Sequence, residues 1–395
     1  MKFSIVIPTH NRLDLLRDAI ETVVRQDYDD WDLVVFDNAS TDDIAGHVAG
    51  LADKRIRCVR SDEFLPVTAS WNRAIDLATG DYIVFLGDDD GLAPRYFSRI
   101  SAIIREFRSP EIVYCAIYQF LHPGVAPWDR RGFVADVRSG FFFVGRDSPF
   151  VLSAAQAREA VRGSIGLRRN FTFNIQAFAF SRAILGRLRG DGPIFRSPFP
   201  DYYLANIALA KSESTVVVPS PMTIAGVSAA SYGFTLFNKL EEQGARILNA
   251  KLAADPLYAE VERFLLPGPL YNSNYVLTME HVVRYAQGFV DCHVDYGRYR
   301  RLQILASLIA GGGWLQPGTD GTQLWPMLAP LEKLWAVVLS VPLLLGRMVG
   351  IEAWVGRVLE RLLGPYGFRP KQLILDRGNF SRLIQVFEAI QKGAF

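Results

Sequence analysis

The 395 residues of the chain exceed one average domain and suit two, and half of them are hydrophobic, so a large core can be buried. There are 43 basic and 41 acidic residues, which leaves a net charge of only +2. This balance excludes the strong positive field by which nucleic-acid-binding proteins attract phosphates, and we expect no nucleic-acid partner.

Short apolar runs alternate with helix-type periodicity over residues 3–100. We expect strands at residues 3–7, 33–36, 56–59 and 82–86, and helices at 13–24, 40–51 and 69–78. This alternation predicts an α/β domain whose sheet is mostly parallel, with helices on both faces. Because ligands of such sheets bind at the carboxyl ends of the strands, the residues that follow strands are the first candidates for a site.

Residues 110–235 mix strand and helix signals, and the chain becomes helical in character after about Phe237. We expect strands at 112–118, 141–144 and 215–218, and helices at 153–162 and 202–210. The predicted organisation is a domain at 1–235 followed by a mainly helical region at 236–395.

Two polar segments follow the first two predicted strands. The first contains Pro8, Thr9, His10 and Arg12, in a position that suits a base or a ribose lying across the loop. The second begins with Asp37, whose carboxylate can accept a hydrogen bond from a base N–H or from ribose hydroxyls. Helix capping by these polar residues is the alternative for both segments, and the residues alone leave it open.

An acidic run, Asp88, Asp89 and Asp90, follows the apolar strand at 82–86 and lies between two glycines. Three adjacent carboxylates repel one another unless a positive charge compensates. A hard divalent cation does so naturally, and Mg²⁺ typically takes one or two carboxylates plus substrate phosphates. We therefore expect a metal site here, with an acidic surface turn as the alternative.

A further acidic residue, Asp201, stands at the start of the helix predicted at 202–210. An aspartate at a helix start is commonly an N-cap, whose side chain accepts a backbone N–H. It can equally be a general base directed into a cleft. The chemistry of the sequence does not decide between these two roles.

Residues 3–100 resemble the family 2 glycosyltransferases, whose nucleotide-binding domain has the GT-A fold. The run from Ser4 to Arg12 looks like the opening strand and loop of that family, with His10 where tyrosine is usual. The run 37–42 looks like the family's Asp-Asp-Gly-Ser-Thr-Asp motif, and the run 87–90 is similar to its Asp-X-Asp region. The resemblance reaches residue 235 and leaves the C-terminal third uncovered.

The resemblance implies a role for each matching residue. His10 would stack on the base, Asp37 would contact the base, and Asp88 would contact the ribose and the metal side. Asp89, with Asp90 beside it, would bind Mg²⁺ or Mn²⁺. The remaining donor-binding residues implied by the match are Pro8, Thr9, Arg12 and Asn72.

Pro200-Asp201-Tyr202 resembles the family's Glu-Asp motif, with Pro200 in place of glutamate. Inverting members use that aspartate as the base. The implied reaction moves a sugar from a nucleotide-diphosphate sugar, a UDP-sugar by family habit, to a hydroxyl of a glycan or a lipid-linked glycan. A nucleotidyltransferase is one alternative, although the loop at 8–12 lacks the glycines typical of that class. A non-catalytic GT-A-like binding or scaffold protein is the other. His281 is a weaker candidate to complete the metal site.

The C-terminal third carries an apolar stripe at helical spacing. Its members are Ile351, Trp354, Val355, Val358, Leu359, Leu362 and Leu363. Residues 343–395 hold eight basic and four acidic residues, which suits an interface helix on anionic lipid. Packing on the catalytic domain or in a homodimer is the alternative.

The cellular location follows from what the chain lacks. The first residues do not have the apolar segment of a signal peptide, and the stretch at 333–347 is too short to span a membrane. Three scattered cysteines are typical of a reducing compartment. We expect a cytoplasmic protein, with peripheral contact to the inner membrane face through the C-terminal helices as an extension of this interpretation.

Overall fold

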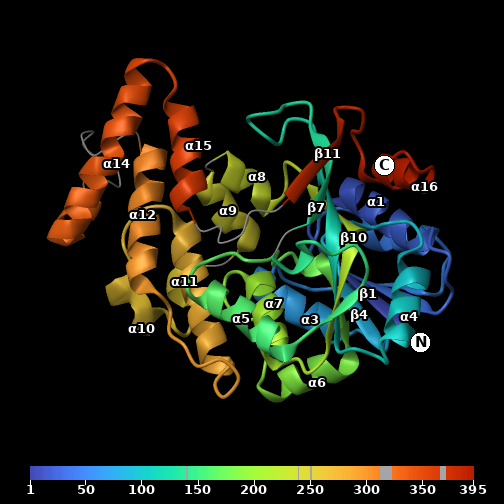
Figure 1. Cartoon of the computed structure of the whole chain (residues 1–395). Helices are drawn as coiled ribbons and strands as arrows, with labels where there is room; N and C mark the ends of the chain where they lie inside the picture. The colour runs from blue at the N-terminus through green and yellow to red at the C-terminus, as the bar shows by residue number, and fades with distance from the viewer. Residues whose placement is uncertain (139–140, 239, 250, 312–322, 365–370) are drawn as a thin grey trace.

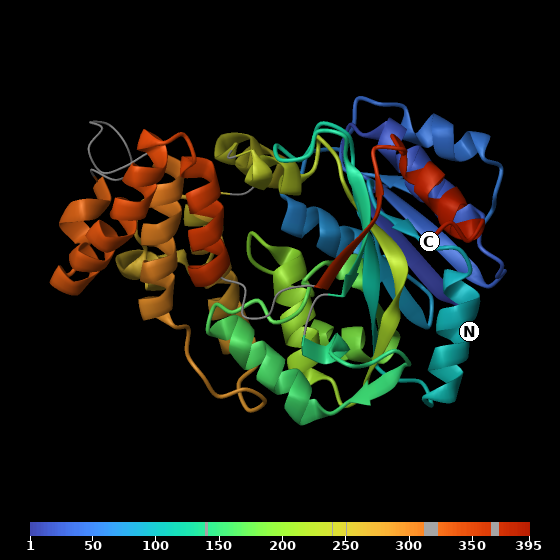
Figure 2. The same ribbon diagram turned by 45° about the horizontal axis from the view of Figure 1, so that its top comes forward.

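A mixed β-sheet lies at the centre of the molecule, with a group of long helices to one side of it (Figure 1). The structure is a computed structural model that describes residues 1–138, 141–238, 240–249, 251–311, 323–364 and 371–395. Figure 2 shows the same arrangement from a second direction, with the helices between residues 296 and 363 at the end away from both termini.

The first half of the sheet is parallel and follows the predicted alternation of strands and helices. Its strands are β1 (Phe3–Thr9), β2 (Trp31–Asp37), β3 (Ile56–Arg60) and β4 (Tyr82–Phe85), in the spatial order β3-β2-β1-β4. The intervening helices are α1 (Leu13–Val24), α2 (Ile44–Gly50) and α3 (Val67–Ile75). Strands buried on both faces read as continuous apolar runs, which is why β1, β2 and β4 were recognisable in the sequence.

The two faces of the sheet bury different sets of side chains. In β1, Phe3, Ile5 and Ile7 pack with α1 and α4 (Tyr96–Glu106), whereas Val6 points into the larger core on the opposite face. This follows from the two-residue period of a strand. The predicted α/β class with helices on both faces is confirmed.

The second half of the sheet is mixed. Strand β9 (Phe178–Ser181) runs antiparallel between β4 and β6 (Ile112–Leu121). The remaining strands are β5 (Gly91–Leu92), β7 (Phe133–Arg138), β8 (Phe150–Leu152), β10 (Thr215–Val227) and β11 (Lys371–Arg377). The strand expected at 141–144 was wrong, because Phe141–Phe143 is a 3-10 helix. Strand β10 runs nine residues beyond the expected end at 218, and the chain that follows it reaches the acidic run.

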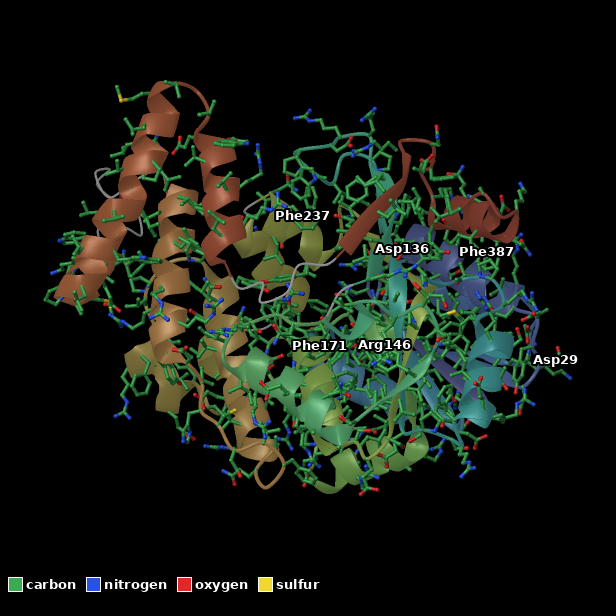
Figure 3. The ribbon with its side chains drawn as sticks, viewed as in Figure 1. Asp29, Asp136, Arg146, Phe171, Phe237 and Phe387 are labelled. Atoms are coloured by element: carbon green, nitrogen blue, oxygen red, sulfur yellow. The ribbon has the colours of Figure 1, made fainter. Side chains whose placement is uncertain are left out.

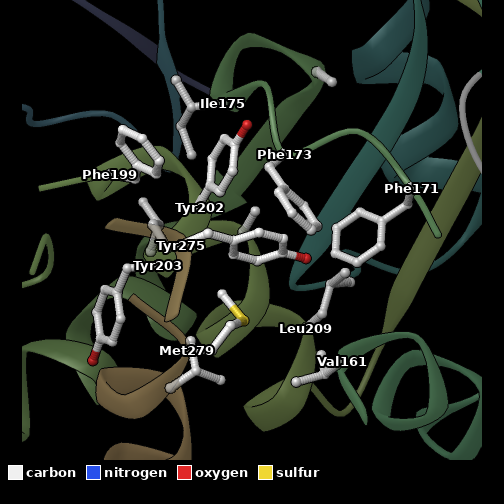
Figure 4. Close-up of a cluster of buried hydrophobic side chains, with 14 of the residues drawn as sticks. Val161, Phe171, Phe173, Ile175, Phe199, Tyr202, Tyr203, Leu209, Tyr275 and Met279 are labelled. Atoms are coloured by element: carbon white, nitrogen blue, oxygen red, sulfur yellow. The ribbon is translucent and has the colours of Figure 1, made fainter. Parts of the chain in front are cut away.

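In helix α7 (Pro200–Lys211) every residue except Asp201 and Lys211 is buried, as expected of a helix that is mostly apolar all round. It lies between α5 (Ala154–Ile165) and α11 (Leu270–Tyr285). Figure 4 shows the cluster around it, where Tyr202 and Phe173 meet Tyr275. The hydrophobic core therefore crosses the boundary expected between residues 235 and 236, and the division into two domains stays a prediction.

Short helices and a long helical group make up most of the chain after β10. Their bounds are α8 (Tyr232–Phe237), α9 (Glu241–Leu248), α10 (Tyr258–Val261), α12 (Tyr296–Gly311), α14 (Pro330–Met348), α15 (Glu352–Leu363) and α16 (Leu383–Gln391). Helix α6 (Arg182–Gly190) follows β9. In the described part of the chain, none of the helices has both the length and the apolar character needed to cross a membrane.

The end of the chain returns to the central sheet, which the sequence did not predict. Strand β11 pairs antiparallel with β7, and α16 packs on α1 and β5. Arg382 forms an ion pair with Asp18 of α1, and Arg25, the residue after α1, has its Nη1 3.0 Å from Oε1 of Glu388. The expected helical region at 236–395 thus contains one strand and one helix that complete the sheet domain.

Removing the side chain of Leu383 is expected to destabilise the protein by about 2–5 kcal/mol, because this buried leucine belongs to a core cluster with Phe120 and Ile224 and lies close to Gly91. Urea unfolding of Leu383→Ala measures the loss. The matched control is Leu373→Ala, at an exposed position of β11, which should change the free energy of unfolding by less than about 0.5 kcal/mol. Equal losses in both variants would show that α16 is not anchored through Leu383.

Candidate active site

The ends of β1, β2 and β4 meet at one edge of the sheet. Thr9 and Asp37 are direct neighbours in the β1–β2 register, and the acidic run follows β4, which pairs with β1 on its other side. The parallel register therefore brings three segments of the predicted site together. Pro8, one residue before Thr9 in β1, pairs with Phe36 of β2.

Asp88 is held by two residues of the first loop. The Arg12 Nη1 donates to Asp88 Oδ1 at 3.0 Å, and Thr9 Oγ1 donates to Asp88 Oδ2 at 2.9 Å. Burial raises the pKa of Asp88 against the opposing charge of Arg12, and Asp89 adds to the rise. Burial alone would lower the pKa of the Arg12 guanidinium, but Asp88 and Asp89 outweigh it and raise that pKa. The predicted residues Thr9, Arg12 and Asp88 thus form one hydrogen-bonded group, within which Arg12 and Asp88 are an ion pair.

Asp89 is fixed through one oxygen only. Ser228 donates to its Oδ2 from Oγ at 3.0 Å, and the Ser231 hydroxyl donates to the same atom. Among the described residues, no protein group donates a hydrogen bond to Oδ1 of Asp89. This leaves one carboxylate oxygen in a buried, negatively charged site open to a cation.

Asp90 is bound by the protein through both oxygens. Gly87 N donates to Oδ2 at 2.8 Å, while Gly226 N at 3.0 Å and Gln176 Nε2 at 3.1 Å donate to Oδ1. Burial, together with Asp89, raises the pKa of Asp90 well above the ordinary range. These contacts favour a structural role, so they argue against the predicted role of Asp90 as a metal ligand, which stays a prediction.

The candidate base site at Asp37 contains two residues that the sequence analysis missed. Asp37 is fully buried, accepts from Ser40 N at 2.8 Å and forms an ion pair with Arg60 at the end of β3. The His10 ring stacks on the exposed ring of Phe64, with ring centroids 4.1 Å apart. Arg60 follows a strand, so the strand-end rule could have found it, whereas no signal marked Phe64.

Asn72 of α3 uses its amide within the protein. Its Nδ2 donates to Phe195 O at 2.8 Å, and its Oδ1 accepts from Phe195 N at 3.1 Å. The amide therefore holds the segment that leads into α7. These contacts argue against the direct donor contact that the resemblance implies for Asn72, and that role stays a prediction.

Asp201 lies in the first turn of α7 but is not the residue that caps it. The N-cap position belongs to Phe199, and Pro200 is the first residue of the helix. Burial raises the pKa of Asp201 to about 6, although the Tyr202 N–H and the charge of Arg169 act in the opposite direction. The Phe199 ring contacts Tyr232, the residue after Ser231, so the start of α7 is joined by packing to the segment that holds Asp89.

Residues 4–157 match the family described as glycosyl transferase family 2. This part of the chain is similar to a family 2 glycosyltransferase domain. Together with the sheet topology, the match confirms the expected GT-A fold with a helical C-terminal region. The matched segment contains the strands and loops that carry Thr9, Asp37 and Asp88 and ends within α5.

Curated proteins with similar sequences are glycosyltransferases by name. A PGL/p-HBAD biosynthesis glycosyltransferase of Mycobacterium tuberculosis is 37% identical over 116 residues, which cover 28% of this chain and 45% of that protein. The GalNAc(5)-diNAcBac-PP-undecaprenol beta-1,3-glucosyltransferase of Campylobacter jejuni is 35% identical over 94 residues, covering 23% and 30%. The matched part of the chain therefore spans less than half the length of these relatives.

Among solved structures, residues 1–349 of S. aureus TarS in complex with UDP are similar. The TM-score is 0.46 and the sequence identity is 15%, with 78% of this chain and 86% of that chain covered.

A preformed cage for a metal ion is absent from the described residues of the family 2 domain and of the helical region, where no three His, Cys, Asp or Glu side chains are placed to hold a metal. His281, considered as an additional ligand, is instead paired with Asp255, with its Nε2 2.9 Å from Oδ1. The open oxygen of Asp89 fits a cation of the Mg²⁺ type, because such ions take few protein ligands and rely on substrate phosphates for others.

Proposed function

We propose that the protein transfers a sugar from a nucleotide-diphosphate sugar, with a UDP-sugar favoured, to a hydroxyl of a glycan acceptor with inversion at the anomeric carbon. The observation that carries the proposal is the Arg12–Asp88–Asp89 group at the carboxyl ends of β1 and β4 in a family 2 domain. The Campylobacter jejuni relative is named for an undecaprenol-linked glycan, which supports a lipid-linked acceptor as the substrate class.

The nucleotide part of the donor would lie over the edge formed by β1 and β2. His10 and Asp37 face this edge, and Arg60 and Ser40 hold the Asp37 carboxylate in place. A fixed acceptor of hydrogen bonds next to an aromatic ring suits a base, which has both a flat face and N–H donors. Arg12 keeps Asp88 oriented through a charged hydrogen bond, so that little reorganisation is needed when the donor binds.

Asp89 is the residue of the site that would hold Mg²⁺ or Mn²⁺, through its Oδ1, together with phosphates of the donor. The cation would supply compensation for the negative charge that grows on the diphosphate as it leaves. Ser228 and Ser231 fix the other oxygen of Asp89 and so orient the carboxylate. Hydrogen bonds of this kind to a ligating carboxylate typically strengthen metal binding.

Asp201 would act as the general base that takes the proton of the acceptor hydroxyl. Its pKa of about 6 makes the carboxylate mostly ionised at neutral pH while keeping it more basic than an ordinary aspartate. A single displacement needs no covalent intermediate, and the site therefore requires no nucleophile of its own.

The activity is expected to fall as the pH drops below about 6, because protonation of Asp201 removes the base. Arg169 opposes the rise of this pKa, so Arg169→Gln should move the acidic limb of kcat/KM to higher pH. Arg169→Lys keeps the charge and is the control. The sign for stability follows from the same shift. Because the pKa of Asp201 is higher in the folded than in the unfolded protein, its protonation stabilises the folded state. This contribution to the free energy of unfolding is fully present below about pH 4 and is lost as the pH rises through about 6. An acidic limb that is equal in all three proteins would contradict the assignment.

A panel of nucleotide sugars with Mn²⁺ tests the proposed function directly. The purified chain should release a nucleoside diphosphate from one donor, slowly with water and faster with a glycan acceptor. A nucleotidyltransferase would instead release pyrophosphate from a nucleoside triphosphate and a sugar phosphate. A scaffold protein would do neither, and that outcome would overturn the proposal.

A further inference from the structure

Helix α14 carries a long apolar face that is exposed in the described part of the chain. Its inner side is buried, with Ala336, Leu339 and Leu343 packed in the core next to α12 and α15. The outer side shows large apolar side chains that are between 43% and 82% exposed. These residues, the α14 apolar face, are Leu331, Leu334, Val337, Val338, Val341, Leu344, Leu345 and Met348.

The α14 apolar face lies at the outer edge of the molecule. In Figures 1 and 2, α14 is at the end farthest from the sheet, and α12 and α15 stand between it and the catalytic domain. Figure 3 shows its side chains projecting outward from that edge. From Leu331 to Met348 the helix rises about 26 Å at 1.5 Å per residue, so the apolar face is long as well as exposed. Monomeric soluble proteins rarely leave such a patch free, and it therefore indicates a binding surface.

The apolar surface continues past both ends of the helix and ends in tryptophans. Trp325 and Met327 precede α14 and are exposed, and Ile351 and Trp354 follow it and are also exposed. Tryptophan at the two ends of an aliphatic surface is typical of residues that sit at the boundary between lipid and water, because the indole ring is apolar with one polar N–H.

The helical segments that pack with α14 carry more basic than acidic side chains. The described residues of α12 and of 323–364 contain seven basic side chains and three acidic ones. Glu332 is paired with Arg300 at 2.6 Å, Glu352 is paired with Arg347 at 2.6 Å, and Glu360 also has an interaction partner. The surplus of positive charge complements the headgroups of anionic lipids.

A second copy of the helix is a poorer occupant. Residues 331, 334, 338, 341, 345 and 348 have the spacing of a coiled-coil seam, but Val337 and Leu344 beside the seam are apolar. Coiled coils usually place charged residues at such flanking positions, where they set partner and register. The α14 apolar face is wider than a seam and lacks those charges.

We propose that the α14 apolar face docks the protein onto the surface of a membrane that contains anionic lipids, with the helix axis lying along the lipid–water boundary. The sequence predicted membrane contact through the apolar stripe at 351–363, most of which lies in α15, whereas the structure favours α14 as the docking surface. In α15, Val355 and Leu359 are partly buried against the core. Of the predicted stripe residues that lie within α15, only Trp354, Leu362 and Leu363 are large apolar side chains with high exposure. This inference does not depend on the proposed transferase activity.

Vesicle flotation of the full chain tests the proposal. Vesicles of phosphatidylcholine with about a third phosphatidylglycerol should carry the protein, vesicles of pure phosphatidylcholine should carry much less, and added salt should release part of it. The double variant Val338→Asp, Leu345→Asp should lower the partition coefficient by about tenfold or more, because two apolar side chains can no longer enter the lipid.

The matched control is Val151→Asp, Leu373→Asp, which alters two apolar residues outside the face. All four positions are 57–60% exposed. The control should float like the unchanged protein, and circular dichroism should show that both variants are folded. Equal flotation of the two double variants, or equal binding to neutral and anionic vesicles, would overturn the proposal. The proposal would also be overturned if light scattering found a dimer in the absence of lipid and the Val338→Asp, Leu345→Asp variant were monomeric. Donor hydrolysis in solution, measured in parallel, reports on the transferase proposal separately.

Discussion

Replacing Asp201 by asparagine is expected to lower kcat by about 10²–10⁴-fold, the usual contribution of a general base, while UDP binding stays nearly unchanged. Asparagine keeps the shape of the side chain and a hydrogen-bond-accepting oxygen, but it cannot take a proton. Since Asp201 lies inside the first turn of α7 and not at its N-cap, little stability should be lost. Steady-state kinetics with the donor identified in the panel and calorimetric titration with UDP measure the two quantities.

The control for Asp201→Asn is Asp147→Asn, the same substitution at a highly exposed position near Arg138. It should leave kcat unchanged, because a surface charge of this kind contributes little. The residual activity of Asp201→Asn should also lack the fall in rate below about pH 6. A variant that loses stability yet keeps its rate would show that Asp201 supports the helix and is not the base.

The part of the site that could be predicted from the sequence is the part built by neighbouring strand ends. Thr9, Asp37 and Asp88 each follow or end a buried strand, and the parallel register then places them at one edge. Apolar runs and the residues directly after them are local features of the chain. A single sequence therefore contained enough information to locate this edge.

The partners of these residues could not be predicted, because they come from far along the chain. Ser228 and Ser231 contact Asp89 across more than a hundred residues, and nothing in their local sequence marks them. Gln176 and Gly226, which both donate to Oδ1 of Asp90, are likewise distant in the sequence, at 86 and 136 residues from it. Adjacent acidic residues therefore looked alike in the sequence and differ in the structure only through remote contacts.

The C-terminal third shows a similar limit. Periodicity predicted a helix at α15 but could not tell which side of it would be covered. Strand β11 pairs with β7, which lies more than two hundred residues earlier, so no local hairpin signal announced it. In the sequence, the apolar stretch at 333–347 is judged by its length, whereas the structure shows that one side of it remains exposed.

The contacts of the acidic run lead to a test that separates Asp89 from Asp90. Asp89→Asn should weaken Mn²⁺-dependent binding of UDP by more than about 100-fold, beyond the 10–100-fold typical of losing a supporting hydrogen bond. The reason is that the amide keeps the contacts with Ser228 and Ser231 but offers the cation no negative charge. Calorimetric titration of UDP with and without Mn²⁺ measures the effect.

Asp90→Asn is the matched comparison, and it should act mainly on stability. Both oxygens of Asp90 accept backbone or side-chain N–H groups, so an amide NH₂ would face a donor such as Gly87 N or Gly226 N. A buried donor without an acceptor costs about 1–3 kcal/mol, which lowers the unfolding midpoint while the folded fraction still binds Mn²⁺ and UDP. The reverse pattern, with metal dependence lost in Asp90→Asn and kept in Asp89→Asn, would move the proposed metal contact from Asp89 to Asp90.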